Sequence, residues 1–131
     1  GGAAEGTFGV HPIAPYGAPV PGMKKVVASH EKWHPGEKGT NVYVEGWVNI
    51  LCVGQALKTA DRAGNLTPAG IRDAFEQFRN FETGGLAPPL TFTSKDHRGS
   101  MAAKIYQVKN GKMVDISGWI ELPRDQEYFG K

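Results

Sequence analysis

The hydrophobic positions in segment 41–61 follow the period of an α-helix. The stripe with i, i+3 and i+4 spacing consists of Val44, Trp47, Val48, Leu51, Cys52, Gln55 and Ala56. No charged residue interrupts it between Glu45 and Lys58, so we expect neighbouring elements to cover this helix on most sides. Gly46 and Gly54 lower its helix propensity, which predicts close packing against a neighbour at these two positions.

Two shorter segments also have a helical pattern. In segment 23–34 the apolar positions fall on one side and the lysines mostly on the other, and Pro35-Gly36 ends the pattern. The third helix is expected to begin at Thr67-Pro68, with the threonine as N-cap and the proline in the first position. Its apolar residues continue to about Phe81, where we expect it to end.

The remaining pattern is that of strands and turns. Strands are predicted for segments 6–13, 90–93, 102–108 and 113–121, and segment 14–22, with its prolines and glycines, is predicted to be a loop. Asn110-Gly111 predicts a tight type I′ hairpin between the last two strands. The tail 123–131 is expected to be loosely held. One strand, three helices and then three strands do not make a complete doubly wound unit, which indicates a piece of a larger α/β protein.

Composition narrows the class of partner. A chain of 131 residues is long enough for one domain, and its formal charge of +2 gives no reason to expect nucleic acid or an anionic membrane as partner. The single cysteine, Cys52, excludes an internal disulfide and lies in an apolar helical pattern, so we expect it to be a buried small hydrophobic residue.

One motif offers an enzymatic alternative. Residues 30–34, HEKWH, fit the pattern H-E-x-x-H, in which two histidines on one helical face bind zinc and the glutamate acts as general base. The alternative function is therefore a small zinc-dependent hydrolase that uses His30, Glu31 and His34. The motif lies in the last helical turn, and Glu37 and Thr40 stand where the extended motif has a glycine and a third histidine. A further hypothesis is a structural domain that dimerises through its apolar helix.

A second set of residues is typical of ligand capture without catalysis. His11 ends the first predicted strand, and in open α/β sheets this edge is where ligands bind. Tyr43, Val44 and Glu45 lie in the first turn of the long helix, where an aromatic ring can stack on a ligand and unpaired N–H groups can meet a carboxylate. Trp47 shares the core stripe and is expected to pack. No paired acids or phosphate loop accompany these residues.

Five segments, in this order, resemble a known family. They are GTFGVHPIAPYG, KKVVASHEKWHP, NVYVEGWVNILCVGQALKTAD, TPAGIRDAFEQF and LAPPLTFTSKDHRGSMAAKIYQVKNGKMV. Together they resemble the C-terminal part of the periplasmic substrate-binding proteins of ABC transporters, of the branched-chain amino-acid type. The resemblance implies an α/β fold: the C-terminal portion of a two-lobe type I periplasmic-binding fold, with three helices and a C-terminal antiparallel hairpin.

The resemblance also implies an organisation. Residues 1–131 would form a single partial domain, in which 1–20 and 100–122 belong to ligand-binding lobe 2 and 21–90 supply the helices of lobe 1. Residues 90–99 would be a crossover and 123–131 a tail. The apolar helix would then lack the sheet on which it packs, so we expect either the missing N-terminal portion or an intertwined second copy beside this chain.

The function implied is that of a solute-binding component of an ABC importer. Its ligand would be an amino acid or a small carboxylate, aromatic ones included, captured between two lobes at Tyr43, Val44, Glu45 and His11. The resemblance implies no catalysis, cofactor or metal, permease subunits as partners, no nucleic acid, and a place in the periplasm of the bacterial cell envelope.

Overall fold

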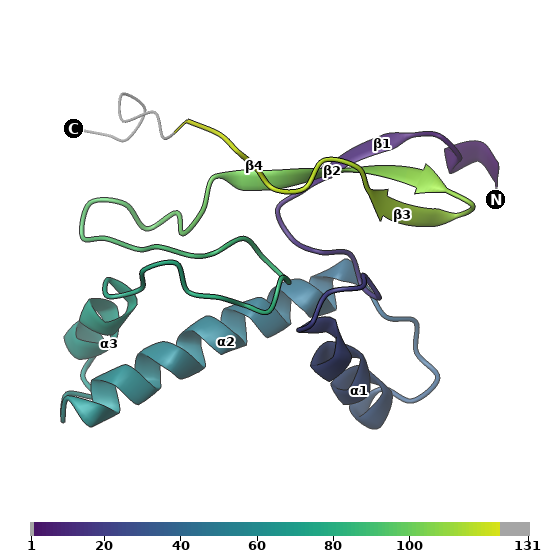
Figure 1. Cartoon of the computed structure of the whole chain (residues 1–131). Helices are drawn as coiled ribbons and strands as arrows, with labels where there is room; N and C mark the ends of the chain where they lie inside the picture. Colours follow the sequence, from purple (N-terminus) through teal and green to yellow (C-terminus); the bar gives the residue numbers. More distant parts are fainter. Residues whose placement is uncertain (1, 124–131) are drawn as a thin grey trace. The chain divides into compact units, whose positions relative to one another are not determined.

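A computed structural model describes residues 2–123, so the predicted tail lies outside the described residues except for Pro123. The chain divides into two compact units (Figure 1). Unit 1 contains the described residues 2–12 and 101–123, and unit 2 contains residues 13–100. Within residues 2–123, no helix combines the length and the hydrophobicity that are needed to cross a membrane.

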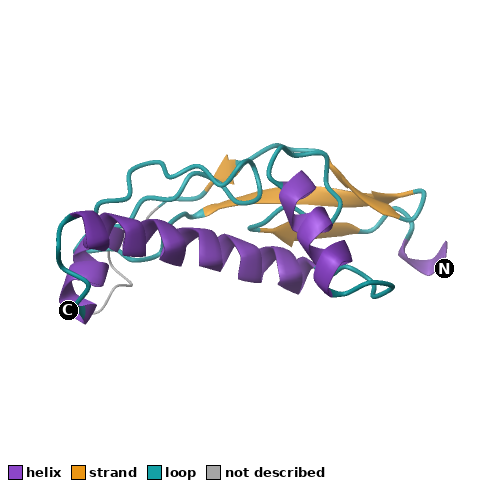
Figure 2. Ribbon diagram, turned by 90° about the horizontal axis from the view of Figure 1, so that it is seen from below, coloured by secondary structure: helices purple, strands orange, loops and turns teal. Residues whose placement is uncertain are grey.

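Unit 2 contains the three predicted helices. They are α1 (Met23–Trp33), α2 (Asn41–Arg62) and α3 (Pro68–Phe75). Figure 2 shows α2 as the longest, with α1 near its N-terminal end and α3 at its C-terminal end. The expected cap of α3 is confirmed, because the Thr67 hydroxyl accepts a hydrogen bond of 3.1 Å from the Gly70 N–H.

One stripe of α2 forms the centre of the core of unit 2. Its members are Val44, Val48, Cys52, Ala56 and Ala60, each 7% exposed or less. Helix and loop residues complete this core: Ile13, Ala14, Met23, Val26, Ala74, Phe78, Leu86 and Ala87. Cys52 is buried as predicted, and its burial raises the pKa of the thiol. The stripe is therefore covered by helices and loops rather than by a sheet.

The opposite side of α2 is open. Four apolar side chains on it are largely exposed: Val42 at 72%, Ile50 at 69%, Val53 at 40% and Leu57 at 39%. A Cβ added at Gly46 or Gly54 would meet no atom within 4 Å. Residues 2–123 therefore do not supply the close neighbours expected at these two glycines, in agreement with the expectation that the helix lacks the sheet on which it packs.

The predicted end of the third helix is wrong. α3 ends at Phe75, six residues before the position that the apolar pattern indicated. The chain turns there: the Phe78 N–H donates to the Phe75 carbonyl at 3.0 Å, and Asn80 adopts the left-handed conformation with φ of 51°. Asparagine tolerates that conformation better than most residues. The turn brings Phe78 into the core and places Phe81 beside Leu90.

The predicted strand 90–93 does not form. Only isolated bridges are present, between Phe81 and Leu90 and between Thr93 and Asp96. The Thr91 hydroxyl accepts a hydrogen bond of 2.9 Å from the Asn80 N–H, a bond that a backbone carbonyl would accept in a ladder. Threonine side chains compete with the backbone in this way, so the segment becomes an irregular loop.

Unit 1 is an antiparallel sheet. Its strands are β1 (Phe8–His11), β2 (Ala102–Lys109), β3 (Lys112–Asp115) and β4 (Ile120–Glu121), preceded by the short 3-10 helix η1 (Gly2–Ala4). The order is β1-β2-β3, and β4 pairs with the beginning of β2. The predicted strands 6–13 and 102–108 are confirmed, the first in a shorter form that ends before Pro12.

The predicted hairpin turn is confirmed. Asn110 and Gly111 have φ of 53° and 72°, the positive values that a type I′ turn requires at both positions. The single predicted strand 113–121 is wrong, because it is divided into β3 and β4. The Asp115 carboxylate accepts hydrogen bonds from the N–H groups of Ser117 and Gly118, at 3.1 and 2.9 Å, and this local turn interrupts the strand.

The two faces of this sheet differ in polarity. The strand register places Phe8, Val10, Val114 and Ile120 on one face, where they are between 39% and 68% exposed. Tyr106 lies on the other face and is 3% exposed. Burial, followed by the charge of Asp115, raises the pKa of Tyr106 to about 12. Lys104 forms an ion pair with Asp115, and this hydrogen bond is the main cause that lowers the pKa of Asp115.

Candidate ligand site

Four aromatic rings meet between α1 and the start of α2. The Tyr43 cluster consists of Tyr16, His30, His34 and Tyr43. His30 is at its centre, with its ring centroid 4.9 Å from that of Tyr43, 5.3 Å from that of Tyr16 and 5.4 Å from that of His34. The two histidine rings are stacked and the two tyrosine rings meet His30 edge-on, which is a favourable geometry for aromatic pairs.

The local sequence fixes Tyr43 at the beginning of α2. The Thr40 hydroxyl caps the helix by accepting a hydrogen bond from the Tyr43 N–H at 3.4 Å. The Asn41 side chain accepts a hydrogen bond of 2.9 Å from the Tyr16 N–H and so holds the first loop at the same helix end. A Cβ at Gly39 would lie 2.2 Å from the ring of Tyr16, so a larger residue at this position would displace that ring.

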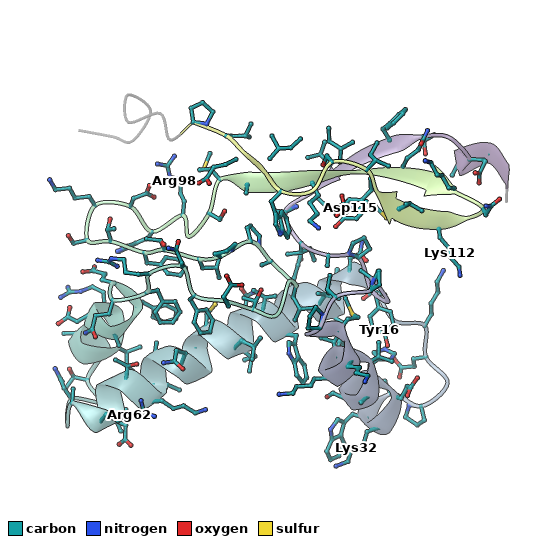
Figure 3. All side chains as sticks on the ribbon, viewed as in Figure 1. Tyr16, Lys32, Arg62, Arg98, Lys112 and Asp115 are labelled. Atoms are coloured by element: carbon teal, nitrogen blue, oxygen red, sulfur yellow. The ribbon has the colours of Figure 1, made fainter. Side chains whose placement is uncertain are left out.

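Polar contacts surround the cluster. The hydroxyl groups of Ser29 and Tyr43 are 3.2 Å apart and form a hydrogen bond. His30 is 5% exposed, whereas His34 lies just after α1 and its Nδ1 is 3.5 Å from the Glu37 carboxylate. Desolvation, followed by the charge of Glu31, raises the pKa of the Tyr16 hydroxyl. Figure 3 labels Tyr16 beside α1.

The predicted ligand-binding residues lie in both units. Tyr43 is half-buried in the cluster. Glu45, two residues later in α2, is exposed. Val44 is 0% exposed, so the whole residue belongs to the core and it offers no accessible atom to a ligand in this structure. His11 lies in unit 1, where its ring is edge-on to Tyr106 at 6.1 Å. Because His11 and the α2 residues belong to different units, their meeting in one site stays a prediction.

The zinc hypothesis needs a third protein ligand. Within residues 2–123 no group of three or more histidine, cysteine, aspartate or glutamate side chains could hold a metal ion. His30 and His34 do share one side of α1, as the spacing predicts, but their rings pack against Tyr43. Within the described residues the two imidazole rings therefore serve packing.

Sequence reasoning did not find Tyr16 or assign His30 to this site. Tyr16 lies in a proline-rich loop with no periodicity, and His30 was interpreted only through the zinc motif. Gly39 next to an N-cap threonine was the available signal, since a glycine before a cap allows another segment to approach closely. The cluster offers aromatic surfaces, hydroxyl groups and imidazole nitrogens, which are groups that hold a small ligand by stacking and hydrogen bonding.

A family model described as "Periplasmic binding protein" matches residues 1–112. The chain belongs to this family. The resemblance that we drew from the five segments is thereby confirmed. No curated protein sequence matches the chain.

Solved structures of this family share the fold. A branched-chain amino-acid ABC transporter protein from Thermus thermophilus, with bound valine, has a TM-score of 0.83 and 20% identity, over 93% of this chain and 35% of that one. A fatty-acid ABC transporter substrate-binding protein from Thermomonospora curvata has a TM-score of 0.77 and 26% identity, over 91% and 31%. A leucine-binding protein from Thermotoga maritima has a TM-score of 0.60 and 22% identity, over 89% and 31%.

These matches confirm the predicted fold class: three helices and antiparallel strands of a type I periplasmic-binding fold. The chain spans about a third of the length of the solved periplasmic binding proteins that it matches, with 35%, 31% and 31% of those chains covered.

Proposed function

We propose that this chain is part of a solute-binding component of an ABC importer, and that it captures its ligand without catalysis. The observation that carries this proposal is the family match over residues 1–112, joined to the aromatic cluster at the start of α2. In a two-lobe receptor a small ligand is held as the lobes close on it. We assign unit 1 to lobe 2 and the helices of unit 2 to lobe 1, with the chain crossing between the lobes.

The ligand class that we propose is an amino acid or a small carboxylate. Two similar structures are named for a bound valine and for leucine binding, and one for fatty acids, so a carboxylate is common to all three. In this chain the ring of Tyr43 would stack on the apolar or aromatic part of the ligand. Val44 would anchor this turn of α2 in the core, and the side chains of Glu45 and His11 would complete the site. We propose an extracytoplasmic location and permease subunits as partners.

Ligand binding can be measured on the 131-residue chain by calorimetry, with valine, leucine, phenylalanine and phenylacetate as ligands. We expect binding by at least one of them, and we expect Tyr43→Ala to weaken it about twofold to tenfold, because loss of the stacking ring removes about 0.5–1.5 kcal/mol of binding free energy. Tyr43→Phe keeps the ring and removes only the hydroxyl bonded to Ser29, so it should bind more tightly than Tyr43→Ala.

Trp33→Ala is the control for this measurement, because Trp33 is an aromatic residue of α1 that is 67% exposed and outside the Tyr43 cluster. It should leave the affinity unchanged. Circular dichroism of each variant checks that the helices are retained. Equal affinity in Tyr43→Ala and the original chain would contradict the site, and absence of binding by all four ligands would contradict the proposed ligand class.

The open stripe of α2 is a further part of this proposal. Val42, Ile50, Val53 and Leu57 expose apolar surface on a helix that also contains two glycines without neighbours among residues 2–123. The solved relatives are about three times as long as this chain, with 31% to 35% of their length covered here. We propose that the part of the family fold outside this chain covers the stripe, and that the two glycines permit its backbone to come close.

Ile50→Lys tests whether this stripe is a surface of the chain on its own. Because Ile50 is 69% exposed, we expect the free energy of unfolding to change by less than about 0.5 kcal/mol. Val48→Lys, on the buried stripe of the same helix, is the matched comparison: Val48 is 7% exposed, and burying a lysine there should prevent folding. A concentration-dependent dimer mass that Ile50→Lys abolishes would instead identify a second copy as the partner.

A further inference from the structure

Unit 2 contains a hollow far from the Tyr43 cluster. It has a volume of about 390 Å³ and is lined by Pro68, Ile71, Arg72, Phe75, Phe92 and His97. These residues come from α3 and the loop after residue 90, at the C-terminal end of α2. Since α2 has 22 residues, it separates the hollow from Tyr43 by roughly 30 Å. The volume is within the range of about 300–1,000 Å³ that is typical of ligand pockets.

Aromatic rings form the apolar part of the hollow. The rings of Phe75 and Phe92 meet edge-to-face, with centroids 5.9 Å apart. Arg79 connects the end of α3 to the loop after residue 90. Its Nη1 donates to the carbonyls of Glu76, Phe78 and Phe92 at 2.8, 2.7 and 2.7 Å. The apolar surface is therefore formed before any ligand arrives.

His97 is held at the rim by a tight turn. The Thr93 hydroxyl accepts a hydrogen bond from the Asp96 N–H at 3.0 Å, and the Asp96 carboxylate accepts from Arg98 Nε and Nη2 at 2.8 and 2.7 Å. Nε2 of His97 then lies 3.0 Å from Oε1 of Glu76, so the loop and the end of α3 meet through this contact.

The rim presents a positive and a negative group side by side. Nε and Nη2 of Arg72 donate to Asp73 at 3.0 and 2.6 Å, whereas Nη1 has no hydrogen-bond partner among residues 2–123. Oε1 of Glu76 is 3.9 Å from Arg72 Nε and is paired with His97, whereas Oε2 has no partner in the same part of the chain. Arg72 lines the hollow, and Glu76 is at its edge through contacts with the lining residues Arg72 and His97, so one donor group and one acceptor group remain beside the apolar surface.

We propose that this hollow binds a free apolar α-amino acid, with its side chain on Phe75 and Phe92, its carboxylate at Arg72 and its ammonium group at Glu76. A zwitterion is complementary to both charged groups of the rim, whereas a simple acid would face the Glu76 carboxylate and a simple amine the Arg72 guanidinium. The site is independent of the ligand site at Tyr43, and the protein would carry both.

A ¹H–¹⁵N NMR titration of the 131-residue chain tests this assignment. Phenylalanine should shift the amide signals of Ile71, Phe75 and Phe92. Phenylacetate and phenethylamine each lack one of the two charges, so each should bind about tenfold more weakly or worse, since a charge-assisted hydrogen bond contributes about 1.5–3 kcal/mol. Phenylacetate binding as tightly as phenylalanine would overturn the assignment, and so would the absence of shifts at these three amides.

Variants test whether the charged residues at the rim of the hollow, rather than other parts of unit 2, bind phenylalanine. Arg72→Gln and Glu76→Gln should each weaken phenylalanine binding about tenfold or more for the same reason. Arg62→Gln, at the exposed end of α2 (Figure 3), is the control and should bind like the original chain. If either variant fails to fold, the comparison of phenylalanine with phenylacetate and phenethylamine on the unaltered chain still tests the roles of the two charges. Shifts confined to the amides around Tyr43 would overturn this site and would support the proposed function.

Discussion

Replacing Leu86 with alanine is expected to lower the free energy of unfolding by about 2–5 kcal/mol. Leu86 is 0% exposed and is among the largest fully buried side chains of the core. It packs so closely on Gly22 that a Cβ there would lie 2.8 Å from Leu86 Cγ. Its carbonyl also accepts a hydrogen bond of 2.7 Å from the Ala14 N–H, so the surrounding loops are held and cannot collapse into the cavity.

Urea unfolding followed by circular dichroism at helical wavelengths measures this loss, because all three α-helices belong to unit 2. Leu66→Ala is the matched control, since Leu66 is 57% exposed and its replacement should change the free energy of unfolding by less than about 0.5 kcal/mol. Similar values for the two variants would mean that Leu86 does not occupy a packed core.

Replacing Thr83 with valine is expected to destabilise unit 2 without creating a cavity. Thr83 is 4% exposed, and its hydroxyl donates to the Ala87 carbonyl at 3.0 Å and accepts from the Ala87 N–H at 2.8 Å. Valine has nearly the same shape, but it leaves both buried backbone groups without a partner. Each such group costs about 1–3 kcal/mol, so we expect a total of about 2–6 kcal/mol.

Thr83→Ser separates the hydrogen bonds from the packing. Serine keeps the hydroxyl and removes only one methyl group, so its cost should be about 1 kcal/mol. The same urea measurement applies to both variants. A larger loss in Thr83→Ser than in Thr83→Val would show that the methyl group, rather than the hydroxyl, holds this loop.

Periodicity predicted the helices well where the apolar residues are also the buried ones. The stripe from Val44 to Ala60 is one example, and the Thr67 cap of α3 is another, because both depend on residues close in sequence. Periodicity failed where apolar residues continue the helical spacing but lie in the loop that follows the helix. Phe78 and Phe81 continue the pattern of α3, but the chain turns after Phe75, so Phe78 lies in the core and Phe81, after the left-handed Asn80, pairs with Leu90. A tertiary contact there outweighs local preference.

The candidate site was predicted only in part, for a related reason. Tyr43 was found because an aromatic ring at a helix N-terminus is a local signal. Tyr16 and His30 join it through contacts between segments that the sequence separates, and no local pattern marks Tyr16. Gly46 and Gly54 predicted a close neighbour but not its position, since a glycine in the sequence does not tell whether its neighbour belongs to the same chain.

Unit 1 is discontinuous along the chain, and this has a consequence for the order of folding. Phe8 pairs with Gln107, so β1 cannot pair until β2 has been synthesised, and all of unit 2 lies in between. Pairing across so many residues raises the contact order of the sheet, while the helices of unit 2 rely on nearby partners. On the ribosome, unit 2 should therefore acquire protection from hydrogen exchange before the sheet does.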